Sequence, residues 1–192
     1  MAENINSRNV SVIKDADGNN IVMINDILFK GKQSINWEEV EIYLKRYVSE
    51  FYNIAEDDEI IYIGTELPNE YAGSIYTKKL KGANAKAKAN AVQGLPEMIE
   101  IASNGVFEEN RKDKHGRDAK NGWYRYDTSF AMPVYSDDGE LERYNVFKAR
   151  LLIRHASSGK KYLYDVLEIK KLFSRWDSSM PCSAFSYWFR RV

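Results

Sequence analysis

The sequence has few of the residues on which metal and covalent chemistry usually depend. Its 192 residues include one cysteine, Cys182, and two histidines, His115 and His155. One cysteine cannot form an internal disulfide, and so few nitrogen and sulfur ligands argue against a structural zinc site. The sequence also has no glycine-rich phosphate loop and no CxxC, HExxH or GxSxG motif. We therefore expect no metal and no cofactor.

Long apolar segments are lacking too. No run approaches the roughly 20 residues that a membrane-spanning helix needs. Residues Met1–Arg8 are polar and have no apolar core of a signal peptide. Together with the single cysteine, this predicts a cytoplasmic protein that does not associate with a membrane. The length fits one domain, which we expect at 1–172, followed by an aromatic C-terminal tail at 173–192.

Charge is balanced overall but unevenly distributed along the chain. The 28 basic and 28 acidic residues cancel, which argues against a DNA mimic and against a basic coat protein. Residues 38–70 nevertheless hold ten acids and two bases, whereas residues 76–125 hold eleven bases and six acids. Such an asymmetry indicates charged partners, although ordinary solvated surfaces would give the same pattern.

A β-hairpin is predicted first, and helices follow. Val10–Ile13 and Ile21–Ile24 are β-rich runs that flank a turn rich in Asp, Asn and Gly. Asn36 and Glu39 have the spacing of a capping box. Apolar residues then recur at helical spacing, which predicts a helix that ends near Ile54.

A strand is predicted at Glu59–Ile63, and the stretch around Pro68 is interpreted as a loop. Residues 83–91 include five alanines, the best helix former, and predict a helix. Pro96 suits the first turn of a further helix that runs to about Ser103.

The second half of the chain is predicted to be a sheet. A polar segment at 108–121 is interpreted as a long surface loop. Alternating patterns then predict strands at 123–128, 130–135, 144–155 and 162–169, joined by turns. The expected fold is therefore α+β, with an N-terminal hairpin and helices followed by a four-stranded antiparallel meander sheet.

Metal-free RNA cleavage is a chemistry that these residues could support. Attack by a 2′-hydroxyl group needs a base, an acid and cations that hold the phosphate. His115 lies in the polar loop, and His155 ends the long strand on which Lys148, Arg150 and Arg154 share one face. We predict the two histidines as the acid and base and the three cations as phosphate holders. The alternative is an ordinary solvent-exposed sheet face.

A basic segment with small side chains predicts a nucleic-acid surface. Residues 76–94 carry five lysines and no acid, and a helix there would turn alanines inward and lysines outward. The lysines could instead contact an acidic protein or residues 38–70 of the same chain. The residues predicted to bind nucleic acid are Lys78, Lys79, Lys81, Lys86, Lys88, Arg111, Lys112, Lys114, Arg117 and Arg125.

Several segments resemble a domain that is common in phage and conjugative-element proteins. They are Ile60–Gly64, Leu67–Ser74, Leu80–Ala91, Gly122–Asp127 and Leu151–His155. The similarity extends over about residues 35–171. Such domains are grouped with polyvalent-protein modules, and some are similar to the nuclease superfamily of barnase, EndoU, colicin E5/D and RelE. The resemblance implies helices followed by a four-stranded antiparallel sheet, and it transfers no catalytic residue, because these vary between branches.

Two specific functions remain open from the sequence, besides the simpler alternative of a structural module of a larger mobile-element protein. The first is a mobile-element effector with a metal-independent ribonuclease fold that binds RNA and acts as a toxin. The second is a non-catalytic counter-defence inhibitor of the anti-CRISPR kind. In that case the acidic residues 38–70 would meet the basic channel of a host nucleic-acid-processing enzyme, and aromatic residues of the tail would anchor the interface.

Overall fold

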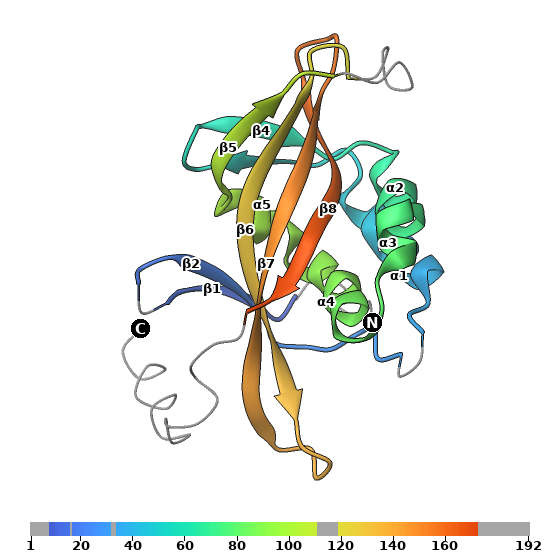
Figure 1. Ribbon diagram of the computed structural model, residues 1–192, viewed down its shortest axis with the longest axis vertical. Coiled ribbons are helices and arrows are strands. Elements are labelled where there is room, and N and C mark those ends of the chain that lie inside the picture. Colours follow the sequence, from blue (N-terminus) through green and yellow to red (C-terminus); the bar gives the residue numbers. More distant parts are fainter. Residues whose placement is uncertain (1–7, 16, 32–33, 111–118, 173–192) are drawn as a thin grey trace, which may run out of the picture.

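Three long strands form the centre of the fold. The computed structural model describes residues 8–15, 17–31, 34–110 and 119–172. Within them, β6 (Trp123–Tyr135), β7 (Leu141–His155) and β8 (Lys161–Lys171) run along the long axis of the molecule (Figure 1). They pair antiparallel in chain order, as their alternating patterns and short turns predict.

Five shorter strands extend this sheet on both sides. They are β1 (Val10–Lys14), β2 (Asn20–Ile24), β3 (Phe51–Ile54), β4 (Glu59–Tyr62) and β5 (Ser103–Glu108). The order is β1-β2-β6-β7-β8-β4-β3, and β5 also pairs with β6. The β2–β6 and β4–β8 pairs are parallel, and the others are antiparallel. The sheet of the described residues is therefore mixed.

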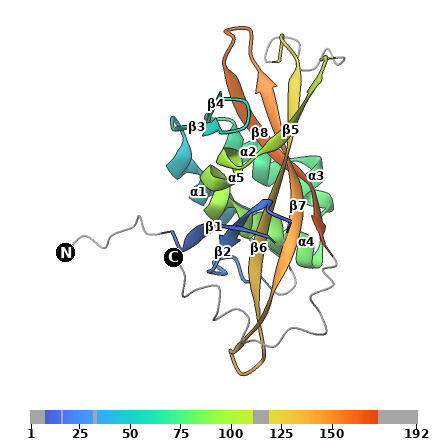
Figure 2. The same ribbon diagram turned by 90° about the vertical axis from the view of Figure 1, so that its left-hand side faces the viewer.

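Helices cover one side of the sheet. They are α1 (Trp37–Leu44), α2 (Leu67–Gly73), α3 (Ile75–Lys79), α4 (Gly82–Ala91) and α5 (Leu95–Glu100), with 3₁₀ turns at Lys45–Tyr47 and Val92–Gly94. Figure 2 shows α1 and α5 to one side of the long strands, and Figure 1 shows α2 and α3 beside β8. None of the helices in the described ranges is long and apolar enough to cross a membrane.

The core lies between the helices and the concave side of the sheet. Phe130 and Phe147 stack across β6 and β7 with ring centroids 5.3 Å apart, and Leu95 and Met98 of α5 belong to the same buried cluster. Close approach is essential at Gly94, where an added Cβ would lie 2.7 Å from a side-chain carbon of Val22. These contacts bury the apolar faces that the sequence patterns predict.

The expected four-stranded antiparallel meander is wrong. Residues 123–128 and 130–135 form one continuous strand, so the meander has three strands. The sheet is larger than expected because it also contains the N-terminal hairpin, the β3–β4 hairpin and β5, with two parallel pairs. Parallel pairing joins segments far apart in the sequence, and no local pattern reports it.

The helical region also differs from expectation. Helix α1 ends at Leu44, and the segment expected to continue it turns at Ser49 (φ 78°) and becomes β3. The stretch interpreted as a loop around Pro68 is helix α2, in which Pro68 occupies the first turn, where its missing N–H has no cost. The N-terminal hairpin, the strand at 59–62 and the alanine-rich helix are confirmed.

Candidate functional site

The predicted catalytic residues lie on two opposite faces of β7. Lys148, Arg150 and Arg154 share one face, as predicted, because β6 and β7 pair there without a register shift. The His155 ring lies on the other face, 5.8 Å from the ring of Tyr124. The structure therefore does not bring His155 together with the cations expected to hold a phosphate. His115 lies outside the described residues.

Carboxylates neutralise two of the three cations on this face. Arg150 Nε lies 3.0 Å from Asp127 Oδ1, and a second guanidinium nitrogen lies 3.4 Å from Glu168 Oε2. Arg154 Nη2 lies 2.9 Å from Glu66 Oε2. Lys148 is exposed. The three cations thus do not form the phosphate platform that their alternation suggests.

The basic segment 76–94 is divided between surface and core. Lys78, Lys79 and Lys81 are exposed, and Lys86 is half-buried. Within the described part of the chain, none of these four forms an ion pair with the acidic residues 38–70. Among the other predicted residues, Arg125 lies 3.1 Å from Glu108 Oε2, and Arg111, Lys112, Lys114 and Arg117 lie outside the described residues.

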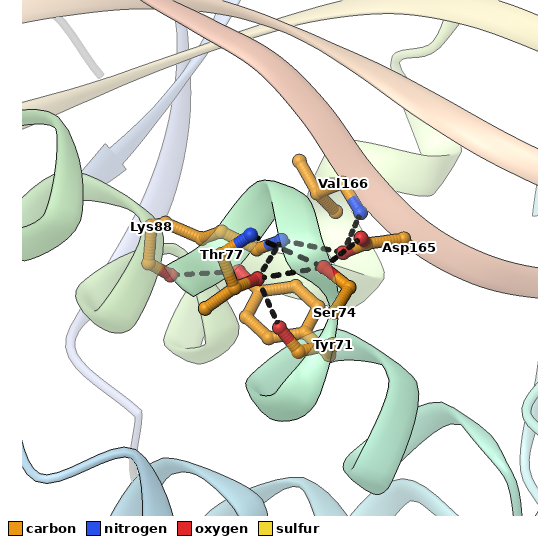
Figure 3. A network of polar contacts seen from close by, with 6 residues as sticks. All are labelled: Tyr71, Ser74, Thr77, Lys88, Asp165 and Val166. Carbon is orange, nitrogen blue, oxygen red and sulfur yellow. Dashed lines mark hydrogen bonds and ion pairs between the residues drawn. The ribbon is translucent and has the colours of Figure 1, made fainter. Parts of the chain in front are cut away.

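Lys88 corrects the prediction that every lysine of α4 faces outward. Its side chain is 1% exposed, and its Nζ donates to Asp165 Oδ1 at 2.6 Å and to Thr77 Oγ1 at 2.7 Å (Figure 3). Burial lowers the pKa of Lys88, and burial also raises the pKa of Asp165, although each charge opposes the shift of the other. Lys88 is therefore unavailable to a nucleic acid.

Hydrogen bonds complete this buried network. Ser74 Oγ donates to Asp165 Oδ2 at 3.0 Å, and the backbone N–H of Val166 donates to Asp165 Oδ1 at 2.7 Å. The Tyr71 hydroxyl donates to the Lys88 carbonyl oxygen at 2.6 Å. A register shift in β8 makes Asp165, rather than Tyr164, the partner of Leu152, and such a bulge redirects side chains. The network joins α2, α3, α4 and β8, and its satisfied polar groups indicate a structural role.

A row of aromatic and cationic side chains crosses the other end of the sheet. Phe51, Tyr62, Tyr162, Arg154 and Trp123 are successive cross-strand partners on β3, β4, β8, β7 and β6. Ring centroids lie 5.9 Å apart for Phe51–Tyr62 and 5.7 Å apart for Tyr62–Tyr162. The guanidinium carbon of Arg154 lies 5.3 Å from the Tyr162 ring centroid. We call these five residues the aromatic row.

A pocket opens beside the aromatic row. Its volume is about 390 Å³, at the lower end of the range typical of small-molecule sites. Tyr62, Tyr162 and Arg154 contribute to its wall, together with the segments 48–50 and 63–66. Lys160 lies nearby, with its Nζ 4.6 Å from the Tyr62 ring centroid. The pocket therefore combines two tyrosine rings with charged groups.

Arg154 is the unusual group of this pocket. The residue is 9% exposed, yet its Nε has no hydrogen-bond partner within the part of the chain that the structure describes. A buried donor without a partner costs about 1–3 kcal/mol. Ser49, which also lines the pocket, has a left-handed φ of 78°, which is uncommon for a residue other than glycine. These two features make the pocket the candidate functional site among the described residues.

Sequence reasoning identified Arg154 but missed the other members of the site. Tyr62 precedes Gly64 at the end of a predicted strand, and Tyr162 begins another, so each is visible as an aromatic residue at a strand end. Only the parallel pairing of β4 with β8 brings them together. Glu66 belongs to the stretch that the sequence predicts as a loop, and no local pattern predicts its contact with Arg154.

Comparisons of the chain with protein-family models and with curated protein sequences give no match. The resemblance to phage and conjugative-element modules therefore stays a prediction, and its implied four-stranded sheet is not the sheet observed. Within the described residues, no group of three or more His, Cys, Asp or Glu side chains is placed to hold a metal ion.

Proposed function

We propose that this protein binds single-stranded nucleic acid, with RNA as the first candidate, across the aromatic row and its pocket. The observation that carries the proposal is the register-aligned series of Phe51, Tyr62 and Tyr162 beside Arg154. Aromatic side chains on a sheet surface stack with unpaired bases, and each stack contributes about 1–3 kcal/mol to binding.

Exposure and charge support the same binding mode. Phe51 is 60% exposed and Tyr62 and Tyr162 are half-buried, so parts of all three are open to a ligand. Lys160 is exposed beside the Tyr62 ring, where it can meet a backbone phosphate. The exposed lysines 78 and 79 lie on α3, which is next to β8 in Figure 1 and offers further phosphate contacts along the same strand.

The proposal is for binding and does not include cleavage. Catalysis by His155 would need phosphate-holding cations within its reach, whereas Lys148, Arg150 and Arg154 lie on the opposite face of β7. The ribonuclease hypothesis also required a four-stranded antiparallel meander, which the fold of the described residues does not have. An origin in a mobile element is a prediction that the binding proposal does not require.

Binding to dye-labelled single-stranded RNA tests the proposal by fluorescence anisotropy. The wild type should bind, and Tyr62→Ala should raise the Kd by about fivefold or more, because one stack is lost. Tyr135→Ala is the control, since Tyr135 is also a tyrosine at a strand end but is exposed and lies at the end of β6 opposite to Trp123. A pre-annealed duplex should compete poorly. Equal Kd values for both variants would refute the role of the aromatic row.

A second candidate is binding to a basic surface of a host nucleic-acid-processing protein. The observation that favours it is the exposure of the acidic segment, where Glu38, Glu39 and residues 56–58 are all exposed. Opposite charges on two partners steer their association. Charge reversal of Glu38 and Glu39 should then weaken capture of such a partner and leave RNA binding unchanged. The aromatic tail assigned to this interface lies outside the described residues.

A further inference from the structure

The pocket beside the aromatic row contains more than stacking surfaces. Besides Tyr62 and Tyr162, two carboxylates, Glu50 and Glu66, and one guanidinium, Arg154, contribute to its lining. With Glu66 paired to Arg154, the charged groups of the lining sum to −1 and disfavour a phosphate, so the neutral base is the part of a nucleotide that we expect to enter. The phosphates then remain outside, on the side of Lys160.

Hydrogen-bonding capacity distinguishes one base from the others. A carboxylate only accepts hydrogen bonds and a guanidinium only donates them, so the charged groups of the pocket offer two acceptor groups and one donor group. Guanine has the complementary Watson–Crick edge, with N1–H and N2–H₂ as donors beside the O6 acceptor. Adenine and cytosine each have one donor group on that edge, and the N3–H of uracil lies between two acceptors.

The arrangement of Arg154 and Glu66 fits this edge. Arg154 Nη2 and Glu66 Oε2 are held 2.9 Å apart, so a donor and an acceptor already stand side by side. The Glu66 side chain is 56% exposed and keeps a second oxygen for a ligand, whereas the Arg154 side chain is 11% exposed. Since Arg154 Nε is itself closed to solvent, a carbonyl oxygen such as O6 would approach the guanidinium at its η nitrogens, beside Glu66.

We propose that the pocket selects guanine, accepting one unpaired guanine base from a single strand against the rings of Tyr62 and Tyr162, with Glu66, Glu50 and Arg154 contacting its hydrogen-bonding edge. This inference rests on the proposed function and adds base specificity to it. Guanine N1–H and N2–H₂ donate to the carboxylates, O6 accepts from Arg154, and the ring packs on the tyrosines. Flanking bases stack along the row towards Phe51.

Short strands that differ at one base test the inference. Dye-labelled RNA strands of about nine nucleotides, within the usual length of a single-strand site, would be all-uridine or carry one central guanosine, inosine or cytidine. The guanosine strand should bind about tenfold more tightly than the all-uridine strand. Inosine, which lacks the N2 amino group, should lose part of that advantage, and cytidine should give none. DNA strands of the same sequences should show the same order, because the argument concerns the base.

Variants of the two carboxylates connect the preference to the pocket. Glu66→Gln and, independently, Glu50→Gln should reduce the guanosine preference to about threefold or less, because an amide replaces one acceptor oxygen by a donor. Glu39→Gln is the matched control, since Glu39 is exposed on α1 and does not line the pocket. It should leave the preference unchanged.

The possible outcomes separate the inference from the function on which it rests. Tight binding of all four strands with one Kd would overturn the guanine preference and leave single-strand binding intact. A guanosine preference that survives in both Glu50→Gln and Glu66→Gln would overturn its placement in this pocket. Failure of the wild type to bind any strand would remove the proposed function and the inference together.

Discussion

Two cation–carboxylate pairs, Lys88–Asp165 and Arg154–Glu66, differ in their burial and in their hydrogen bonding. Lys88 and Asp165 are 1% and 2% exposed at their side chains, and hydrogen bonds from Ser74 and Val166 complete their surroundings. Arg154 and Glu66 are 11% and 56% exposed, and Arg154 Nε has no partner among the described residues. A buried pair whose charged atoms all have hydrogen-bond partners fixes the packing of helices on a strand, whereas a partly exposed pair at a pocket leaves polar groups for a ligand.

The largest expected effect is on the buried pair. Lys88→Ala should lower the free energy of unfolding by about 3–5 kcal/mol, because it leaves the Asp165 carboxylate buried without its counter-charge. Urea denaturation followed by tryptophan fluorescence measures the change. Lys86→Ala is the matched control, two residues earlier in α4 and half-buried, and it should change the free energy of unfolding by about 0.5 kcal/mol or less.

Replacement of both partners sharpens the same test. Lys88→Met combined with Asp165→Leu removes both charges. The double variant should lose less free energy of unfolding than Lys88→Ala does, because the cost of desolvating the charges disappears. A double variant as unstable as the single one would show that the network contributes mainly through its hydrogen bonds. Equal stability of Lys88→Ala and Lys86→Ala would contradict the structural assignment of the pair.

The second effect should appear in binding rather than in stability. Arg154→Met keeps a long side chain against Tyr162 and removes the guanidinium, so RNA binding should weaken by about 1.5–3 kcal/mol, the contribution of hydrogen bonds to a charged group. The free energy of unfolding should change by about 1 kcal/mol or less, because Glu66 is more than half exposed and is not left buried without a partner. Anisotropy and urea denaturation on the same preparation compare the two quantities.

A loss of stability without a loss of RNA binding in Arg154→Met would contradict the distinction between the two pairs. If Arg154→Met unfolded the protein while leaving RNA binding per folded molecule unchanged, Arg154 would be structural like Lys88. Lys148→Met serves as the control, since Lys148 lies on the same face of β7 but is exposed and does not line the pocket.

The local elements of the fold could be predicted from the sequence, whereas the buried pair and the pocket could not, because both depend on contacts between distant segments. The alanine-rich helix, the N-terminal hairpin and the long strands follow from local periodicity, and the structure confirms them. The role of Lys88 does not, because helical spacing alone cannot tell a lysine at the surface from one that meets Asp165, 77 residues away. The pocket depends in the same way on the parallel pairing of Tyr62 with Tyr162.

The errors in the fold have local causes as well. Apolar spacing from Trp37 to Phe51 continues past the real end of α1, because Tyr47 is still buried in the 3₁₀ turn and only the left-handed Ser49 ends the helical course. The alternating pattern predicts two strands that are separated at Ser129, whereas Ser129 continues β6 opposite Lys148. The first error predicts helix where β3 lies, and the second divides β6 into two shorter strands.

The smallest expected effect is a pH dependence of the buried pair. Burial raises the pKa of Asp165 above its ordinary value of 3.8 in the folded protein, while the unfolded chain titrates at the ordinary value. As the pH falls from the raised pKa of Asp165 towards 3.8, the folded state takes up a proton before the unfolded state does. The free energy of unfolding that this carboxyl contributes therefore rises on acidification. Asp165→Asn lacks this titration.

The free energy of unfolding of the wild type minus that of Asp165→Asn should therefore rise as the pH falls from the raised pKa to 3.8, because the other carboxylates contribute equally to both proteins. Urea denaturation at a series of acidic pH values measures this difference. The same subtraction with Asp137→Asn, in an exposed turn, should give a difference that varies little with pH. A wild-type advantage that shrinks on acidification would mean that the charge of Lys88, and not burial, dominates the carboxyl. The buried pair would then be an ordinary stabilising ion pair, and its double replacement by Met and Leu should lower the stability of the protein.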